Sequence, residues 1–254
     1  MSEPSPQGGH GSRFGRGTVA LTVLAFLLVF VAANRDYLMG RAFPLYDADG
    51  FFAPFYMFLA DLTRHGQLLT WNPFVNAGSP DFADPQVGAF DPIVLLFGLV
   101  TGSHVLGFLV YWLVMWSAAG IGILLLARRF GCGMPLALVV ALGFAFSGFF
   151  LGHTQHTSFI RSFAFLGLTL WRLDEALGAR RPRAAIESGV LWALSGLAGS
   201  PAILFLNLVA ATAWTAGRLF LLEQDPEPVS EGSAPRQRLR WPGRGELRNG
   251  LAGL

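Results

Sequence analysis

Apolar runs that approach the length of a bilayer crossing recur along this chain, and short polar connections separate them. A transmembrane helix needs roughly 17 to 25 mainly apolar residues. Six segments come near this length: Thr18 to Ala33, Val105 to Leu126, Met134 to Leu151, Ser158 to Leu173, Ala184 to Leu197 and Pro201 to Leu222. The pattern predicts an all-α integral membrane protein with about six transmembrane helices.

The last two of these segments need a turn between them. Read as one helix, Ala184 to Leu222 would be about 58 Å long, roughly twice the thickness of the hydrocarbon core. We therefore expect Gly199-Ser200-Pro201 to form a hairpin turn. A further apolar stretch, Pro92 to Val100, is too short to cross and predicts a re-entrant or interfacial helix.

The long connection after the first segment contains an amphipathic stretch, Gly50 to His65. Helical spacing places Phe51, Phe55, Phe58 and Leu62 on one face, and the polar residues fall mostly at the far end. Such a pattern is typical of a helix that lies in a membrane interface. Its simplest role is an anchor that seals the connection to the bilayer.

Composition supports a membrane environment. Hydrophobic residues make up 53% of the 254 residues and charged residues 13%, whereas charged residues are about a quarter of a soluble domain. The net charge of +2 indicates no acidic partner such as nucleic acid. Cys132 is the only cysteine, which excludes an internal disulfide and a zinc site built on cysteines.

The distribution of arginine predicts the orientation. All 18 basic residues are arginine, and 14 of them lie before the first segment, in alternate connections or in the tail. These are Arg13, Arg16, Arg128, Arg129, Arg172, Arg180, Arg181, Arg183, Arg218, Arg236, Arg238, Arg240, Arg244 and Arg248. Basic connections stay in the cytoplasm, so we expect the N-terminus inside and the loop 34–104 on the outer face of a bacterial inner membrane. A cleavable signal peptide ending near Ala33 would leave this loop outside as well.

The chain divides into three parts on this interpretation. Residues 1–17 form a cytoplasmic N-terminal segment and residues 18–222 the transmembrane domain. Residues 223–254 are rich in Pro, Glu, Gly and Arg, which is typical of a flexible cytoplasmic tail. The final apolar run, Leu251 to Leu254, predicts the opening of a further helix and a fragment of a longer protein.

Several polar residues on the outer side are candidates for function. Asp47 and Asp49 precede the amphipathic helix, and Asp49 is equally well explained as its N-cap. Arg161 lies near the outer end of the fourth segment, where it suits a phosphate ligand, or else snorkels or pairs with a loop aspartate. His153 and His156 have the i, i+3 spacing of metal ligands, or are polar edge residues.

The outer loop as a whole resembles the first outer loop of the YfhO-type membrane proteins, a branch of the GT-C glycosyltransferases. The resemblance rests on Asp47, Pro54, Gly66, Trp71-Asn72-Pro73, Gly78-Ser79-Pro80, Ala83-Asp84-Pro85-Gln86 and Phe90-Asp91-Pro92, and continues at Gly152-His153 and Ala198-Gly199-Ser200-Pro201. It spans roughly residues 18 to 222. Ser200 stands where the family has His, and no Trp-Pro pair follows His153.

The resemblance implies a GT-C-like fold and an enzyme that moves a sugar from a polyprenyl-phosphate donor to a cell-envelope glycan or glycolipid acceptor at the outer face. Asp47 would be the base, and Asp49 a helper or metal ligand. The residues expected to bind substrates are Arg161, Trp71, Asn72, His153, His156 and Gln86, of which Trp71 is also explained as an interfacial anchor. Whether a divalent cation takes part is left open.

Two further classes remain open. One is a transporter or lipid-handling membrane protein without chemistry, and the other is a non-catalytic membrane scaffold, in which Asp47 would be exposed and replaceable. A transporter concentrates polar groups at mid-membrane, whereas here they gather at the outer interface. If the enzyme interpretation holds, Asp47, the helix Gly50 to His65 and the outer ends of the third and fourth segments should meet at one cavity.

Overall fold

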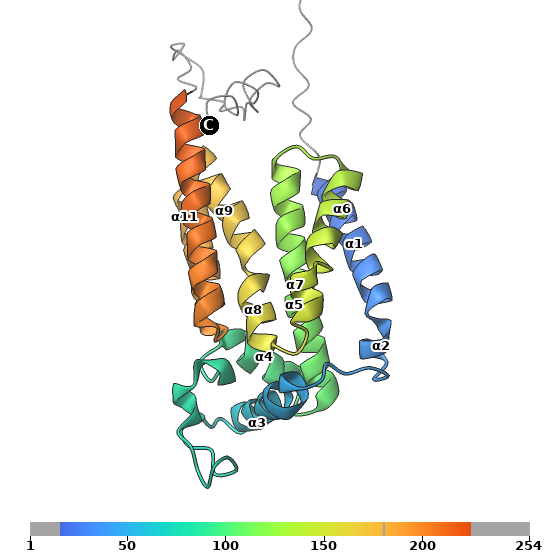
Figure 1. Ribbon diagram of the computed structural model, residues 1–254, viewed down its shortest axis with the longest axis vertical. Helices are drawn as coiled ribbons and strands as arrows, with labels where there is room; N and C mark the ends of the chain where they lie inside the picture. Colours follow the sequence, from blue (N-terminus) through green and yellow to red (C-terminus); the bar gives the residue numbers. More distant parts are fainter. Residues whose placement is uncertain (1–15, 180, 225–254) are drawn as a thin grey trace, which may run out of the picture.

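The protein is a bundle of antiparallel helices with one large loop folded over an end of the bundle (Figure 1). The computed structural model describes residues 16–179 and 181–224. The bundle comprises α1 (Arg16–Ala33), α5 (Val105–Arg129), α6 (Met134–Ala145) with α7 (Gly148–Gly152), α8 (Thr157–Ala164) with α9 (Leu166–Ala179), α10 (Pro182–Leu197) and α11 (Pro201–Gln224). These helices run alternately away from and toward the loop, and no strand occurs in the described ranges. The predicted all-α class is confirmed.

Within residues 16–179 and 181–224, three helical stretches are long and apolar enough to cross a membrane. They are Val105–Arg129, Met134–Gly152 and Pro201–Phe220. Gly17–Ala33 and Pro92–Thr101 are apolar but shorter. The structure thus supports a membrane protein, and the six crossings expected from the sequence remain a proposal.

Helix α5 lies at the centre of the bundle and carries most of its core. Trp112 and Trp116 are fully buried, and they lie edge to face with ring centroids 5.2 Å apart. Helix α9 reaches the backbone of α5 through a pair of glycines, because a Cβ on Gly122 would overlap the backbone of Gly167 and Leu168. Small residues at a crossing allow such close packing between helices in a membrane.

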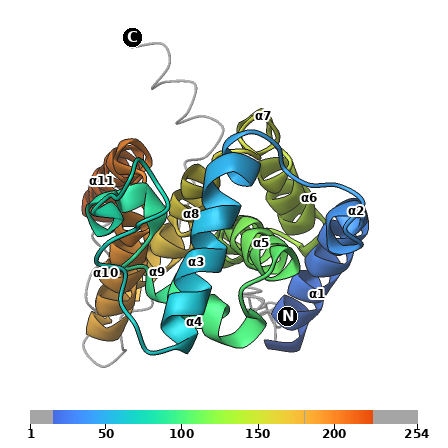
Figure 2. The same ribbon diagram turned by 90° about the horizontal axis from the view of Figure 1, so that it is seen from below.

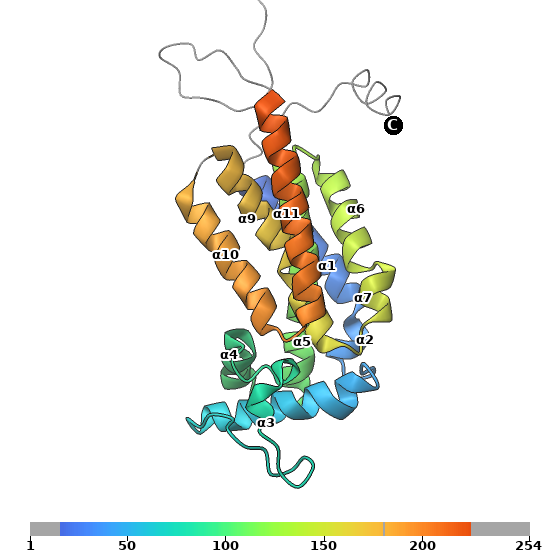
Figure 3. The same ribbon diagram turned by 60° about the vertical axis from the view of Figure 1, so that its left-hand side comes forward.

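The loop covers the end of the bundle at which α5 begins. It contains α2 (Arg35–Leu38), the π-helical turn η1 (Ala48–Phe52), α3 (Ala53–Arg64), the short 3₁₀ turns η2 (Asp81–Ala83) and η3 (Pro85–Val87), and α4 (Pro92–Thr101). Helix α3 lies across the ends of the bundle helices, with α4 beside it (Figures 2 and 3). The expected short helix after Pro92 is therefore present, on the loop side.

The apolar face of α3 is turned toward the protein. The expected stripe began at Phe51, but the most buried large side chains are Phe52, Phe55, Tyr56 and Leu59. A Cβ on Gly98 of α4 would lie 2.8 Å from the Ala60 Cα, so the two helices nearly touch. The interpretation of this helix as only a bilayer anchor is incomplete, because its largest side chains pack on α4 and α5.

Ion pairs join the helices at the opposite end. The buried carboxylate of Asp174 in α9 accepts from Arg129 of α5 and lies 2.6 Å from Arg218 of α11. Arg172 binds Glu175 and also Glu187 of α10. The helix ends that contain the arginine clusters therefore meet at one end of the bundle. This agrees with the predicted arginine-rich connections alternating along the chain. Which side of the membrane this end faces stays a prediction.

The boundary between α10 and α11 agrees with the predicted hairpin. Helix α10 ends at Leu197, α11 begins at Pro201, and Gly199 between them has φ of +86°. The predicted tail lies outside the described residues except for its first two positions, which continue α11.

Candidate functional site

Asp47 stands at the start of η1, where the loop meets the bundle. The preceding Tyr46 has a positive φ of 57°, which turns the chain sharply into the helix. The Asp47 side chain is 59% exposed, and its Oδ2 lies 3.5 Å from Nε2 of His156. The carboxylate is therefore open to a substrate on one side and faces an imidazole on the other.

His156 connects Asp47 to His153. The Nδ1 atoms of the two histidines are 3.1 Å apart, so one ring donates a hydrogen bond to the other. The His156 ring is stacked on Phe159, and the His153 ring lies 4.9 Å from the ring of Phe149. These aromatic neighbours hold both imidazoles in place at the turn between α7 and α8.

The three side chains form a line and do not surround a point. His156 meets His153 through Nδ1 and Asp47 through Nε2, on opposite sides of its ring. Across the described residues, no group of three or more His, Cys, Asp or Glu side chains is placed to hold a metal ion.

Asp49 lies inside η1, and its interpretation as an N-cap is wrong. Asp47 occupies the cap position of η1 and Phe52 that of α3, and neither makes a side-chain capping bond. The Asp49 side chain is exposed, and its backbone N–H donates to the Tyr46 carbonyl at 3.1 Å. The π-helical turn moves the start of the regular helix beyond Asp49.

Arg161 is enclosed by the loop and by the turn before α11. Only 3% of its side chain is exposed. Its Nη2 donates to the carbonyl oxygens of Ala198 and, at 3.3 Å, of Gln86, and its Nη1 lies 3.8 Å from Oδ2 of Asp91. Of the roles open to Arg161 from the sequence, the structure shows the pairing with a loop aspartate.

Two glycines permit this arrangement. A Cβ on Gly88 would lie 2.8 Å from Nη1 of Arg161, and one on Gly199 would overlap the carbonyl oxygen of Pro85. Both residues have a positive φ, which is costly for any other residue. Glycine at these positions lets the loop segment 85–88 rest directly on Arg161 and on the turn.

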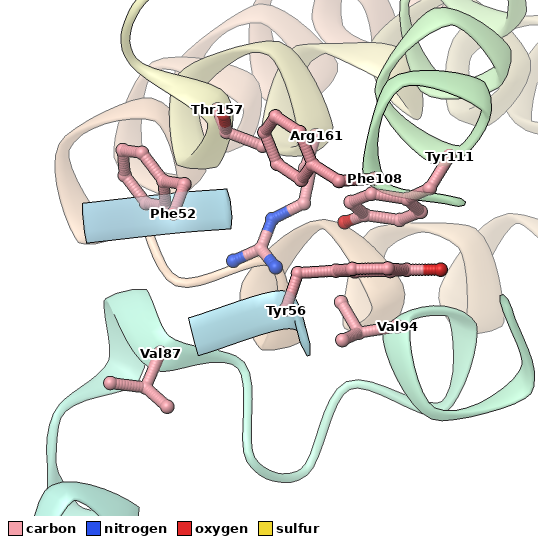
Figure 4. Close-up of a pocket in the computed structure, with 8 residues that line it drawn as sticks. All are labelled: Phe52, Tyr56, Val87, Val94, Phe108, Tyr111, Thr157 and Arg161. Atoms are coloured by element: carbon pink, nitrogen blue, oxygen red, sulfur yellow. The ribbon is translucent and has the colours of Figure 1, made fainter. Parts of the chain in front are cut away.

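A small cavity of about 10 Å³ adjoins Arg161 (Figure 4). Its walls come from the loop elements η1, α3, η3 and α4 and from the bundle helices α5 and α8: Phe52, Tyr56, Val87, Val94, Phe108, Tyr111, Thr157 and Arg161. Three buried polar atoms here, Nε of Arg161, Oγ1 of Thr157 and the Tyr111 hydroxyl, have no hydrogen-bond partner within the described part of the chain. The Tyr56 hydroxyl instead bonds Oγ1 of Thr101 at 2.6 Å.

Asp91 is the buried acid of this region. Its Oδ1 accepts from the N–H of Ile93 at 2.9 Å and so caps α4. Burial raises the pKa of Asp91, while the Arg161 charge and the backbone N–H groups of Ile93 and Val94 oppose the rise. Asp91 matched the sequence motif but was not among the candidate site residues, although Asp-Pro before an apolar run is a typical helix start.

The remaining candidates, Gln86, Asn72 and Trp71, make no side-chain contact with Asp47 or Arg161 among the interactions of the described residues. The Gln86 side chain is exposed, and its carbonyl makes the contact with Arg161. Asn72 is buried and donates to Asp81 at 2.7 Å, while its Oδ1 accepts from the N–H of Phe74. The Trp71 side chain is exposed and its indole covers Gly78. Asn72 and Trp71 therefore shape the loop segment 71–81.

Asp47 meets the turn between the third and fourth segments through His156, but the cavity that was expected to join them is lined neither by Asp47 nor by the third segment. The cavity lies next to this contact, since Thr157 follows His156 in the chain and Phe52 ends the turn that Asp47 begins. Tyr56 and Tyr111 were not singled out from the sequence, because their spacing is also that of ordinary core residues.

Comparison with known proteins gives no assignment. No family model matches the chain, and neither a curated protein nor a solved structure is similar enough to count as a match. The resemblance noted in the outer loop therefore stands on its residues alone.

Proposed function

We propose that this protein is a GT-C-like membrane glycosyltransferase that moves a sugar from a polyprenyl-phosphate donor to a cell-envelope acceptor at the outer face of the inner membrane. One observation carries the proposal. Asp47, the base implied by the sequence resemblance, is an open carboxylate that lies beside His156, at the end of the bundle covered by α3.

The chemistry suits a single carboxylate. Asp47 would take the proton of the acceptor hydroxyl as its oxygen bonds to the anomeric carbon of the sugar. The bond between that carbon and the polyprenyl phosphate breaks, and the phosphate leaves with the electron pair. Because a phosphate leaves without prior protonation, a general base suffices, whereas glycoside hydrolysis uses an acid as well.

The position of the site suits a donor that is anchored in lipid. With six crossings and the predicted orientation, α3 would lie along the outer membrane surface, and Asp47 would stand at its beginning. A phosphate headgroup lies at this depth while its polyprenyl chain stays in the hydrocarbon core.

In this proposal Arg161 is not the phosphate ligand that its sequence position suggested. Its guanidinium is occupied by the Ala198 and Gln86 carbonyls and lies near Asp91, so we assign it to holding the loop on the bundle. The exposed indole of Trp71 remains the candidate for stacking on a sugar.

Asp47→Asn tests the proposal. The protein would be purified into lipid vesicles and supplied with radiolabelled polyprenyl-phosphate hexoses and an extract of bacterial envelope glycolipids. Asp47→Asn should reduce transfer by about 100-fold to 10,000-fold, because the amide keeps the size but cannot accept the proton. Normal insertion and thermal stability would show that the variant is folded.

Asp49→Asn is the matched control, two residues along the same turn and exposed. It should lose far less activity than Asp47→Asn, because the carboxylate that faces His156 is that of Asp47. A dead Asp49→Asn with an active Asp47→Asn would move the base to Asp49. Absence of transfer from every polyprenyl-phosphate hexose by the wild-type protein would contradict the proposed function.

A lipid-handling protein is the second candidate, favoured by a cleft between α9, α10 and α11. The cleft has a volume of about 550 Å³, and its walls are mostly apolar, with Trp192 and Leu208 among them. A lipid transporter would move a fluorescent polyprenyl phosphate between leaflets equally well in the wild type and in Asp47→Asn.

A further inference from the structure

We propose that His156 receives the proton that Asp47 removes from the acceptor, and that His153 is the positioning residue that keeps His156 ready to receive it. This inference rests on the proposed function and deepens it. It is carried by the line of contacts Asp47, His156 and His153, with separations of 3.5 Å and 3.1 Å.

The proposed path requires one of the two proton arrangements that the contact between the Nδ1 atoms of His153 and His156 allows. A neutral imidazole has one N–H and one lone pair, and the hydrogen bond at one nitrogen determines which form is present. If Nδ1 of His156 donates to Nδ1 of His153, then Nε2 of His156 carries the lone pair. That lone pair faces Oδ2 of Asp47.

The proton transfer then balances without another reactant. The acceptor O–H bond breaks and its proton moves to Asp47, whose O–H passes it to the Nε2 lone pair of His156. The product is an imidazolium beside a carboxylate, and the His156 cation still donates from Nδ1 to His153. Water finally takes the proton, since 28% of the His156 side chain is exposed.

The surrounding elements contain few competing charges. Asp49 is the other acid of η1, and its side chain is exposed. On α8, the next charged residue is Arg161, whose partners are Asp91 and two backbone carbonyls. From α7 and the following turn, the neighbours of the imidazoles are aromatic, with Phe149 against His153 and Phe159 against both rings.

Two substitutions of His153 separate positioning from packing. His153→Asn retains an acceptor close to the position of Nδ1 but removes the aromatic ring. His153→Phe retains a ring that packs against Phe149 and Phe159 but has no acceptor. Positioning predicts that kcat falls more in His153→Phe, with KM for the donor little changed, whereas packing alone predicts the reverse order.

His156→Gln removes the proton acceptor and keeps a polar group near Nε2. It should lower kcat by about 100-fold, the lower range for loss of an acid–base group. Added to Asp47→Asn, it should cause little further loss, because the two residues act in one step. Independent, multiplying losses would contradict the inference.

A spectroscopic measurement tests His153 without activity. In full-length protein in lipid vesicles, ¹⁵N NMR of labelled histidine, assigned with His156→Gln, should show His156 with its proton on Nδ1. This form should persist in His153→Asn and change to the Nε2–H form in His153→Phe. A wild-type His156 that carries its proton on Nε2 would overturn the inference.

These outcomes remain distinct from failure of the proposed function. An active Asp47→Asn overturns the base and the inference together. An inactive Asp47→Asn with fully active His156→Gln and His153→Phe overturns only the proton path and leaves the glycosyltransferase proposal in place.

Discussion

Gly199 lies so close to Pro85 that a Cβ on Gly199 would overlap the Pro85 carbonyl oxygen. This contact joins the turn between α10 and α11 to the loop segment that follows η2. The same segment supplies the Gln86 carbonyl that accepts from Arg161. The loop is thus fixed to the bundle at the side of the candidate site.

Gly199→Ala should loosen this contact. The added methyl group clashes with the Pro85 carbonyl, and the φ of +86° is unfavourable for alanine. We expect a loss of about 1–3 kcal/mol in the free energy of unfolding, measured by thermal unfolding in detergent. Gly189→Ala in α10 is the control, because a Cβ there meets nothing within 4 Å. Equal stability of the two variants would contradict the close contact between Gly199 and Pro85.

Arg161→Met should destabilise the protein by removing the partner of Asp91. It leaves a buried carboxylate without its nearby charge and two carbonyls without their donor, a change that typically costs about 3–5 kcal/mol. Asp91→Asn in the same chain should restore part of the loss, because no buried charge then remains. A double variant as unstable as the sum of the single variants would show that the two residues do not interact.

Stability should depend on pH through Asp91. Burial raises its pKa above the ordinary value of 3.8, so the folded protein holds this proton more tightly than the unfolded chain. The contribution of Asp91 is therefore greatest below that value and is lost as the pH rises through the raised pKa. Chemical unfolding of the wild type and of Asp91→Asn would be measured from acid to neutral pH. The free energy of unfolding of the wild type, relative to that of Asp91→Asn, should fall as the pH rises. A relative stability that does not change with pH would contradict the raised pKa of Asp91.

Asp174→Asn should weaken the opposite end of the bundle. The Asp174 side chain is fully buried between Arg129 and Arg218, and its loss leaves two arginines without their shared carboxylate. Breaking a buried pair typically costs about 3–5 kcal/mol. Arg183→Ala is the control, since its pair with Glu187 is 91% exposed on the arginine side and worth about 0.5 kcal/mol or less. Thermal unfolding should separate the two variants clearly.

The predicted orientation can be tested with cysteine labelling. The loop residue Phe74 is 82% exposed, and Cys132 lies in the connection between α5 and α6, at the other end of the bundle. Phe74→Cys, made together with Cys132→Ser, should react with an impermeant maleimide in intact cells. Wild-type Cys132 should react only after the membrane is permeabilised. The reverse pattern would overturn the orientation and the access to an outer acceptor.

The sequence by itself determined the elements that depend on local pattern. Apolar runs of sufficient length predicted the helices at Val105 and Pro201, and the helical length limit predicted the turn at Gly199. The short helix after Pro92 was also foreseen from its apolar run, and the Asp91 cap and the proline that start it are local features as well. These features arise from residues a few positions apart, so no knowledge of the fold is needed to find them.

The tertiary structure alone decided how the candidate residues are used. Arg161 binds carbonyls 75 and 37 residues away in the chain, and spacing within the sequence does not show which distant groups will enclose it. The same holds for the contact of Asp47 with His156, and for α3, whose apolar side meets protein because α4 and α5 are there to cover it. Helical periodicity shows that a face is apolar, but only packing determines whether lipid or protein buries it.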